Sequence, residues 1–395
     1  MGHMTVAQAA AKWGVSARRA QVLLREGRVK GATRLGGHAW LIPGDAEKPG
    51  DPRRARRTPS ETLHAELEVL SATLEDPRGL PWDNPDVAAA TVADPSMRML
   101  CEGWLAYLRG DFDGVKRKFQ SISDGATRLY ASSLAAAAAA STGDWALLRD
   151  IQAHCREQAA AGGLAGSIAE WAATNVNTGA HVPNMIPDWV KNGDFGHLPV
   201  QLRWDALYRH ARWLHHEKKT EAALAAARVG LSFYDRAHGI TSPGVYLRIS
   251  AAMACSQMGR LDKAREYLAE VMDDCMPLGF ITPFAENSPH LGGLAEQVAG
   301  QKYPALCAAM EAQARQTIPN WMEFHNRHAK KHVTPLLSPR EYQIAKVAVS
   351  GATRREIAER FHLSPGTVKN EISRIYQTLF ISGKNRKEQL ARHIL

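Results

Sequence analysis

Apolar residues recur at helical spacing along most of the chain. From position 61 to about 326, leucines, alanines and aromatic residues return every three or four positions, which is the period of an amphipathic helix. The same spacing returns near the C-terminus, where Val368, Ile372, Ile375 and Leu379 form one apolar stripe. Strands are predicted only near the N-terminus, where a glycine pair separates two short β-prone runs. The pattern therefore predicts a mainly α protein.

One pattern repeats within the middle segment. Gly110-Asp111 follows one apolar stretch, and Gly143-Asp144 follows another. The two glycines lie 33 positions apart, close to the roughly 34-residue period of tetratricopeptide repeats. A similar turn and second helix recur at 246–268 and, more weakly, at 204–224. Residues 61–326 therefore resemble a degenerate tetratricopeptide array, which implies an α-helical repeat domain whose concave surface senses a small molecule, a peptide or a protein partner.

Four tryptophans surround the most irregular part of this segment, Gly179 to Pro199. Together they are candidates for the lining of a ligand pocket: Trp171, Trp189, Trp204 and Trp213. The alternative is that these side chains belong to the core, because large apolar side chains are more often buried there.

Three helix starts are visible near the C-terminus. Ser338-Pro-Arg-Glu341 and Thr353-Arg-Arg-Glu356 are capping boxes, and Ser364 before Pro365 is a favourable N-cap. The face of the third helix opposite its apolar stripe carries short polar side chains and cations. These are Thr367, Asn370, Ser373, Arg374 and Gln377, with Lys369 at the edge. A short helix, a tight turn and a second helix with an exposed polar face is the helix-turn-helix pattern.

Three stretches of this region resemble the C-terminal DNA-binding domain of LuxR-type transcription regulators: Leu337-Ser-Pro-Arg-Glu341, Arg355-Glu-Ile-Ala-Glu-Arg360 and Ser364-Pro-Gly-Thr-Val-Lys369. The resemblance covers residues 334–395 and implies four helices. The third helix would lie in the major groove of double-stranded DNA, and the fourth would help to pair two protomers into a homodimer on DNA.

The resemblance also implies roles for single residues. Lys369, Asn370 and Ser373 would read bases, while Thr367 and Arg374 would contact phosphates. Glu371 departs from the basic or neutral residue usual at its position. A small helical bundle that binds no nucleic acid is the alternative.

The N-terminal segment, residues 4–48, predicts a second DNA-binding unit. Its helix, turn, helix and hairpin resemble the winged helix-turn-helix of the MerR/excisionase type in Trp13-Gly-Val-Ser-Ala-Arg-Arg19, Glu26-Gly-Arg-Val29 and Ala39-Trp-Leu-Ile-Pro43. This resemblance implies that Arg18, Arg19 and Gln21 face the major groove. It also implies that Arg34 and His38 of the wing lie along the backbone. A winged helix that only contacts protein is the alternative.

Charge divides the chain into three parts. Residues 1–60 hold 12 Lys/Arg against 4 Asp/Glu, a balance of +8 that includes the basic linker 49–60. Residues 327–395, which begin with a second linker at 327–333, hold 14 against 5, a balance of +9. The middle holds 23 against 31, a balance of −8. Two basic ends around an acidic centre predict two nucleic-acid contacts.

Several other functions lack their sequence signals. The chain has no G-x-x-x-x-G-K-[ST], no G-x-S-x-G and no H-E-x-x-H, so we expect no cofactor and no enzyme activity. His325, His328 and His332 have helical spacing, but the lysines between them favour a solvated connector over a metal site. The odd number of cysteines, the lack of a signal peptide and the lack of a long apolar run predict a cytoplasmic bacterial protein without a membrane segment.

The sequence thus predicts a sequence-specific transcription regulator with two DNA-binding units joined by a helical sensor domain. One alternative is a repeat-based protein-interaction scaffold that is anchored to DNA. An enzyme in the middle segment is the other alternative, and no catalytic constellation supports it.

Overall fold

The computed structural model divides the chain into two compact units, Met1–Thr62 and Leu63–Leu395. It describes residues 3–35, 39–49, 84–123, 125–233, 241–291, 293–300, 302–329, 337, 339–379, 381, 383 and 385–394. The predictions for His38, for Ser338 as a helix cap and for most of the two linkers fall outside these residues.

The described residues of the first unit form two helices and a small sheet. Its elements are β1 (His3–Met4), α1 (Val6–Trp13), α2 (Ala17–Arg25), β2 (Thr33–Leu35) and β3 (Ala39–Pro43). The antiparallel sheet has the order β1-β3-β2, so the hairpin forms at the predicted place, and β1 is an additional edge strand that the sequence pattern did not predict. The Trp13 indole donates to the carbonyl oxygen of Ala46 at 3.1 Å and ties α1 to the end of the sheet.

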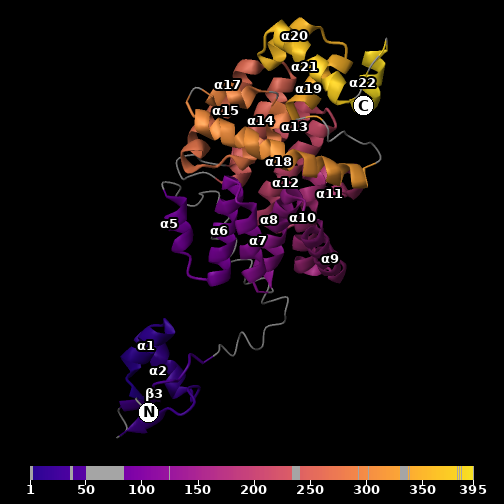
Figure 1. Cartoon of the computed structure of the whole chain (residues 1–395). Helices are drawn as coiled ribbons and strands as arrows, with labels where there is room; N and C mark the ends of the chain where they lie inside the picture. Colours follow the sequence, from indigo (N-terminus) through magenta and orange to yellow (C-terminus); the bar gives the residue numbers. More distant parts are fainter. Residues whose placement is uncertain are drawn as a thin grey trace. The chain divides into compact units, whose positions relative to one another are not determined.

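The second unit is built almost entirely from helices (Figure 1). Its larger part contains α5 (Pro85–Ala90), α6 (Pro95–Arg109), α7 (Phe112–Ser121), α8 (Ala126–Thr142), α9 (Trp145–Ala161), α10 (Gly163–Gly179), α11 (Asp188–Asn192), α12 (Arg203–His216), α13 (Thr220–Leu231), α14 (Ser242–Gln257), α15 (Leu261–Cys275), α16 (Thr282–Leu291), α17 (Leu294–Ala299) and α18 (Pro304–His328). In the described residues, single 3-10 turns at Pro183–Met185, Val200–Leu202 and Met276–Leu278 lie between helices.

Consecutive helices of this part form pairs, and neighbouring pairs pack on one another. Thus α6 packs on α7, α8 on α9, α12 on α13 and α14 on α15. Between pairs, α8 contacts α6 and α10, while α14 contacts α12 and α16. The small side chains of α8 suit this close packing, because Ala135 to Ala140 are all buried.

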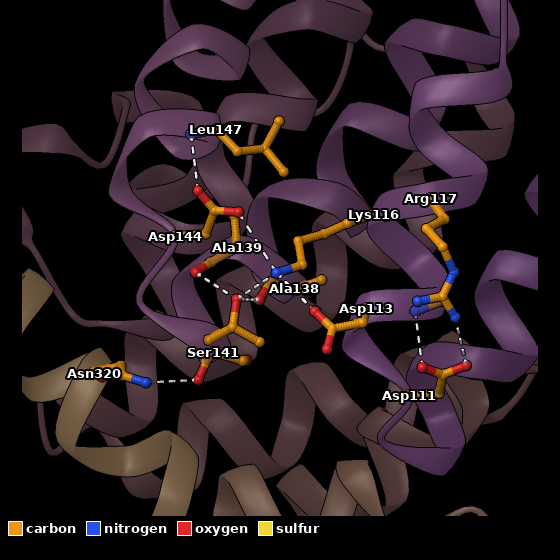
Figure 2. Close-up of polar contacts among 12 residues, drawn as sticks. Asp111, Asp113, Lys116, Arg117, Ala138, Ala139, Ser141, Asp144, Leu147 and Asn320 are labelled. Atoms are coloured by element: carbon orange, nitrogen blue, oxygen red, sulfur yellow. Dashed lines mark hydrogen bonds and ion pairs between the residues drawn. The ribbon is translucent and has the colours of Figure 1, made fainter.

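The turns inside the pairs explain the sequence repeat. Gly110 and Gly143 both adopt the left-handed conformation, with φ of 86° and 71°, and the aspartate that follows each glycine caps the next helix. Asp144 accepts the amide of Leu147 at 3.2 Å, and the ammonium of Lys116 lies 2.9 Å from Asp113 and 3.5 Å from Asp144 (Figure 2). The same turn therefore recurs in both pairs, and Lys116 of α7 links its own helix to the capping aspartate of α9.

Helix α18 packs across the stack. It contacts both α8 and α16, and the Asn320 amide donates to the carbonyl oxygen of Ser141 at 2.8 Å (Figure 2). The Trp321 indole donates to the Ser141 hydroxyl at 3.1 Å. A Cβ atom on Gly179 of α10 would lie 2.9 Å from the Trp321 ring, so only glycine permits this approach.

Four helices complete the second unit: α19 (Pro339–Val349), α20 (Arg354–Phe361), α21 (Pro365–Thr378) and α22 (Arg386–Ile394). They share a separate apolar core that includes Ile344, Phe361, Val368, Ile375 and Leu390. Helix α19 also packs against α16 and α18. In the part of the chain that the structure describes, no helix is long and apolar enough to cross a lipid bilayer.

Candidate functional site

The exposed face of α21 is the first candidate. Ser364 caps the helix by accepting the amide of Thr367 at 3.0 Å, and the two hydroxyl groups lie 2.9 Å apart. Val368 and Ile375 are fully buried, whereas Lys369, Asn370 and Ser373 are exposed. The helix therefore presents the predicted base-reading side chains to solvent. Thr367 is half-buried, and its hydroxyl already has the Ser364 partner.

Arg374 has a protein partner on this face. Its Nε donates to Oε1 of Glu341 on α19 at 2.7 Å, and one terminal nitrogen lies 4.0 Å from Glu371. This bond with Glu341 raises the pKa of Arg374. The Arg374 side chain remains 63% exposed, while that of Glu341 is 8% exposed. The guanidinium is therefore held at the surface by a buried carboxylate, and Glu371 lies beside it.

Helix α2 of the first unit presents a similar exposed face. Arg18, Arg19 and Gln21 are all exposed. Arg34 on β2 is exposed as well, and its guanidinium lies 5.4 Å from the centroid of the Trp40 ring. The structure thus places the predicted residues of this unit at its surface.

The second candidate is a cavity of about 340 Å³ inside the second unit. Its walls come from the first helices of the stacked pairs, from α10, α16 and α18, and from α19. Aromatic side chains dominate these walls: Trp104, Tyr107, Tyr130, Trp171, Trp204, Tyr208, Tyr246, Trp321 and Tyr342.

The structure separates the four predicted pocket tryptophans. Trp171 and Trp204 line the cavity. Trp189 and Trp213 pack instead with Ile186 and Val190 in a small apolar cluster. The irregular segment after α10 thus builds its own cluster, and the cavity lies along the regular helices.

Two buried arginines lie one turn apart on α12. Arg209 forms an ion pair with Asp205 at 2.6 Å, and its guanidinium lies 4.6 Å from the centroid of the Trp171 ring. Among the described residues, Arg212 donates only to neutral acceptors, namely the side chain of Asn287, the Gly179 carbonyl oxygen at 3.1 Å and the Tyr208 hydroxyl at 3.4 Å. Its Nε has no hydrogen-bond partner.

Glu286, one of the acids on the cavity wall, forms no ion pair with Arg212 in the described structure. Glu286 accepts the Tyr107 hydroxyl at 2.9 Å. Burial raises the pKa of Glu286, while hydrogen bonding to Tyr246 and the Arg212 charge oppose this rise. The site thus contains a buried cation and a carboxyl group whose burial favours its neutral form.

Histidines gather beside Arg212. The rings of His181 and His216 stack with centroids 4.2 Å apart, and His290 lies 5.2 Å from both His215 and His216. Burial lowers the pKa of His181 to about 4 and that of His215 to about 3, so both rings are neutral at pH 7. Among the described residues, no group of His, Cys, Asp and Glu has an arrangement that could hold a metal ion.

These polar cavity residues were missed at the sequence level. One signal was present in α12, where Asp205, Arg209, Arg212 and His216 follow one another at spacings of four, three and four. Such a polar stripe on a helix that is otherwise rich in buried residues indicates a polar interior. The histidines come from α12, α16, α18 and the turn after α10, and no sequence spacing links them.

Residues 335–390 match the family model of bacterial regulatory proteins of the luxR family. The match includes α19, α20, α21 and most of α22, and it supports a DNA-binding transcription regulator; this family is not an enzyme family. No curated protein and no solved structure matches the chain significantly.

Proposed function

We propose that this chain is a sequence-specific transcription regulator whose helical domain senses an effector. The observation that carries the proposal is the exposed polar face of α21, which lies inside the luxR-family match and opposite an apolar stripe in which Val368 and Ile375 are fully buried. A helix that is anchored on one face and presents short polar groups and cations on the other suits the major groove.

The side chains of α21 then divide by role. Lys369, Asn370 and Ser373 read base edges, because they are exposed on the outer face. Thr367 and Arg374 contact phosphates and set the orientation of the helix. Two copies bind as a homodimer, with α22 contributing to the contact between protomers.

The other parts extend this function. The paired helices are a tetratricopeptide-like array that holds the effector site. The first unit is a MerR/excisionase-like winged helix that makes a second DNA contact through Arg18, Arg19, Gln21 and Arg34. Its exposed cations and the +8 balance of residues 1–60 support this role.

The test begins with DNA fragments selected from a random pool by the full-length protein. On the selected site, Lys369→Ala and Arg374→Ala should each weaken binding in gel-shift titrations. Asn370→Ala should relax the preference at one base position by roughly 1–3 kcal/mol. Lys263→Ala is the matched control, because this exposed lysine lies on α15, outside the luxR-family match, and in the described part of the chain it forms an ion pair only with its neighbour Glu266. Unchanged affinity and preference in all three α21 variants would contradict the assignment.

A further inference from the structure

Two arginines on the cavity wall are similarly buried but have different partners. Arg209 and Arg212 are both buried on α12, with 2% and 7% of their surface exposed. Arg209 has the carboxylate of Asp205 as its counter-charge. Among the residues that the structure describes, no carboxylate forms an ion pair with Arg212. A buried charge without a counter-charge is costly, so Arg212 is an unsatisfied electrostatic feature of the cavity wall.

The neighbouring groups do not supply the missing negative charge. Glu286 is occupied by the Tyr107 hydroxyl, and burial raises its pKa. His181 and His216 line the same cavity. In the described structure, Nδ1 of His181 and Nε2 of His216 have no hydrogen-bond partner. A neutral imidazole can present an N–H there, and Arg212 Nε–H is unpartnered as well. These groups offer donors to a ligand, and Lys346 adds another basic side chain to this wall.

The remaining walls determine the shape and polarity of the ligand. Trp104, Trp171, Trp204 and Trp321 contribute indole rings, and Tyr130 and Tyr246 contribute phenol rings. Such walls stack on flat aromatic ligands and contribute most of the binding energy of a pocket this size.

We infer that the cavity binds a small aromatic compound carrying one anionic group, with the anion against Arg212 and the ring among the tryptophans. The inference rests on the proposed regulator function only in treating this ligand as the effector. The anion would supply the counter-charge that Arg212 lacks, and a charge-assisted bond of this kind is stronger than a neutral one.

The cavity also connects the ligand to the DNA-binding helices. Tyr342, Gln343 and Lys346 of α19 line it, and α19 lies within the luxR-family match. Glu341 on the same helix holds Arg374 of α21. A ligand in the cavity therefore contacts the helix that positions a predicted phosphate-binding arginine, which gives it a direct way to alter DNA affinity.

The test uses two fluorescent probes of similar shape and different charge. These are 8-anilinonaphthalene-1-sulfonate, which is an aromatic anion, and N-phenyl-1-naphthylamine, which is its neutral counterpart. Titrated into the full-length protein without DNA, both should bind. Arg212→Gln should weaken binding of the sulfonate by at least about tenfold and binding of the neutral probe by less than about twofold. Lys263→Gln, which changes an exposed cation on α15, should affect neither probe.

The other results for these probes either support the anion site or overturn it. Equal sulfonate binding by Arg212→Gln and the unmodified protein would overturn the inference, as would a protein that binds the neutral probe but not the sulfonate. If Arg212→Gln binds neither probe, Arg212→Lys decides. Retained sulfonate binding by the lysine variant supports an anion site, and retention of the neutral probe alone overturns it. No DNA is present in the probe titrations, so a result that overturns the anion site leaves the DNA-binding proposal intact. In the same way, the effect of the α21 variants on DNA binding leaves the inference about the cavity intact.

Discussion

Helices α2 and α21 begin in the same way and then differ in how their cations are held. Each begins at a serine whose hydroxyl accepts the amide three residues later, Arg19 in α2 at 3.2 Å and Thr367 in α21 at 3.0 Å. Each follows a turn with one left-handed residue, Gly14 with φ of 64° or His362 with φ of 53°. Both helices are thus fixed at their N-termini by the same interactions and expose a polar face.

The two helices differ in how their cations are held. In the described chain, Arg18 and Arg19 of α2 have no ion-pair partner. Arg374 of α21 is held by Glu341, a carboxylate that is almost buried. Free arginines contribute mainly sequence-independent attraction to phosphates, whereas a positioned guanidinium fixes register. If both helices contact DNA as proposed, we expect α2 to add mainly affinity and α21 to add mainly specificity.

The largest expected effect comes from removing the first unit. Without residues 1–60, affinity for a long selected operator should fall at least ~10-fold, because the second contact gains from effective concentration when both units are linked. In the full chain, Arg18→Ala with Arg19→Ala should lower the slope of log affinity against log salt by roughly 2, since two phosphate contacts are lost. Salt titrations of DNA binding measure both quantities.

The matched control for the arginine pair is Arg28→Ala in the same unit, because Arg28 already pairs with Glu26 at 3.2 Å. Superimposable salt titrations for the full-length and shortened proteins would mean that the first unit does not touch that DNA. A winged helix that contacts protein would then replace the DNA-binding hypothesis for α2.

A smaller effect should follow when the constraint on Arg374 is removed. Glu341→Gln removes the buried carboxylate charge, so the guanidinium is held less tightly, although Glu371 remains beside it. We expect the salt slope to steepen by up to ~1 and the affinity at low salt to rise a few-fold. Discrimination between the best base and its competitors should narrow, because a mobile guanidinium fixes register less well. Binding titrations on the operator and on a scrambled fragment measure these changes.

The control is the double variant Glu341→Gln with Arg374→Ala, which should match Arg374→Ala alone if Glu341 acts only through Arg374. A fall in affinity for Glu341→Gln would show that the ion pair presents Arg374 to the phosphate, and the contrast drawn between α2 and α21 would then be wrong.

Part of this comparison was visible in the sequence, because caps and apolar stripes are local. Ser364 and the Thr353–Glu356 capping box each form the predicted hydrogen bonds. The mainly helical fold and the luxR-family domain were predicted correctly for the same reason. The bond between Arg374 and Glu341 was not predicted, since it joins positions 33 residues apart on different helices. Pairing of this kind depends on how helices pack, which spacing along one helix does not encode.

The cavity shows the same limit more strongly. The clustering of four tryptophans around one irregular segment predicted a pocket, and Trp171 and Trp204 do line a cavity. The groups that determine its chemistry were missed, because Arg212, Glu286 and His181 come from three separate segments that meet only when the helix pairs stack. Sequence reasoning found the residues that one helix face brings together and missed those that only the packed domain brings together.

The smallest expected effect concerns the two turns. A Cβ atom on Gly14 would meet no atom within 4 Å, so Gly14→Ala should cost about 1 kcal/mol through its positive φ alone. His362 already adopts a left-handed conformation that is unfavourable for a residue with a side chain. His362→Gly should therefore raise the free energy of unfolding of its domain by about 0.5 kcal/mol. The increase is small because the half-buried imidazole ring is lost at the same time. Urea unfolding of the full chain, followed by amide signals from each unit, measures both changes. DNA affinity should stay within about twofold in both variants, because neither side chain lies on the exposed faces compared above. If His362→Gly proves destabilising, the imidazole contributes more by packing than its backbone conformation costs, and the two turns are not equivalent.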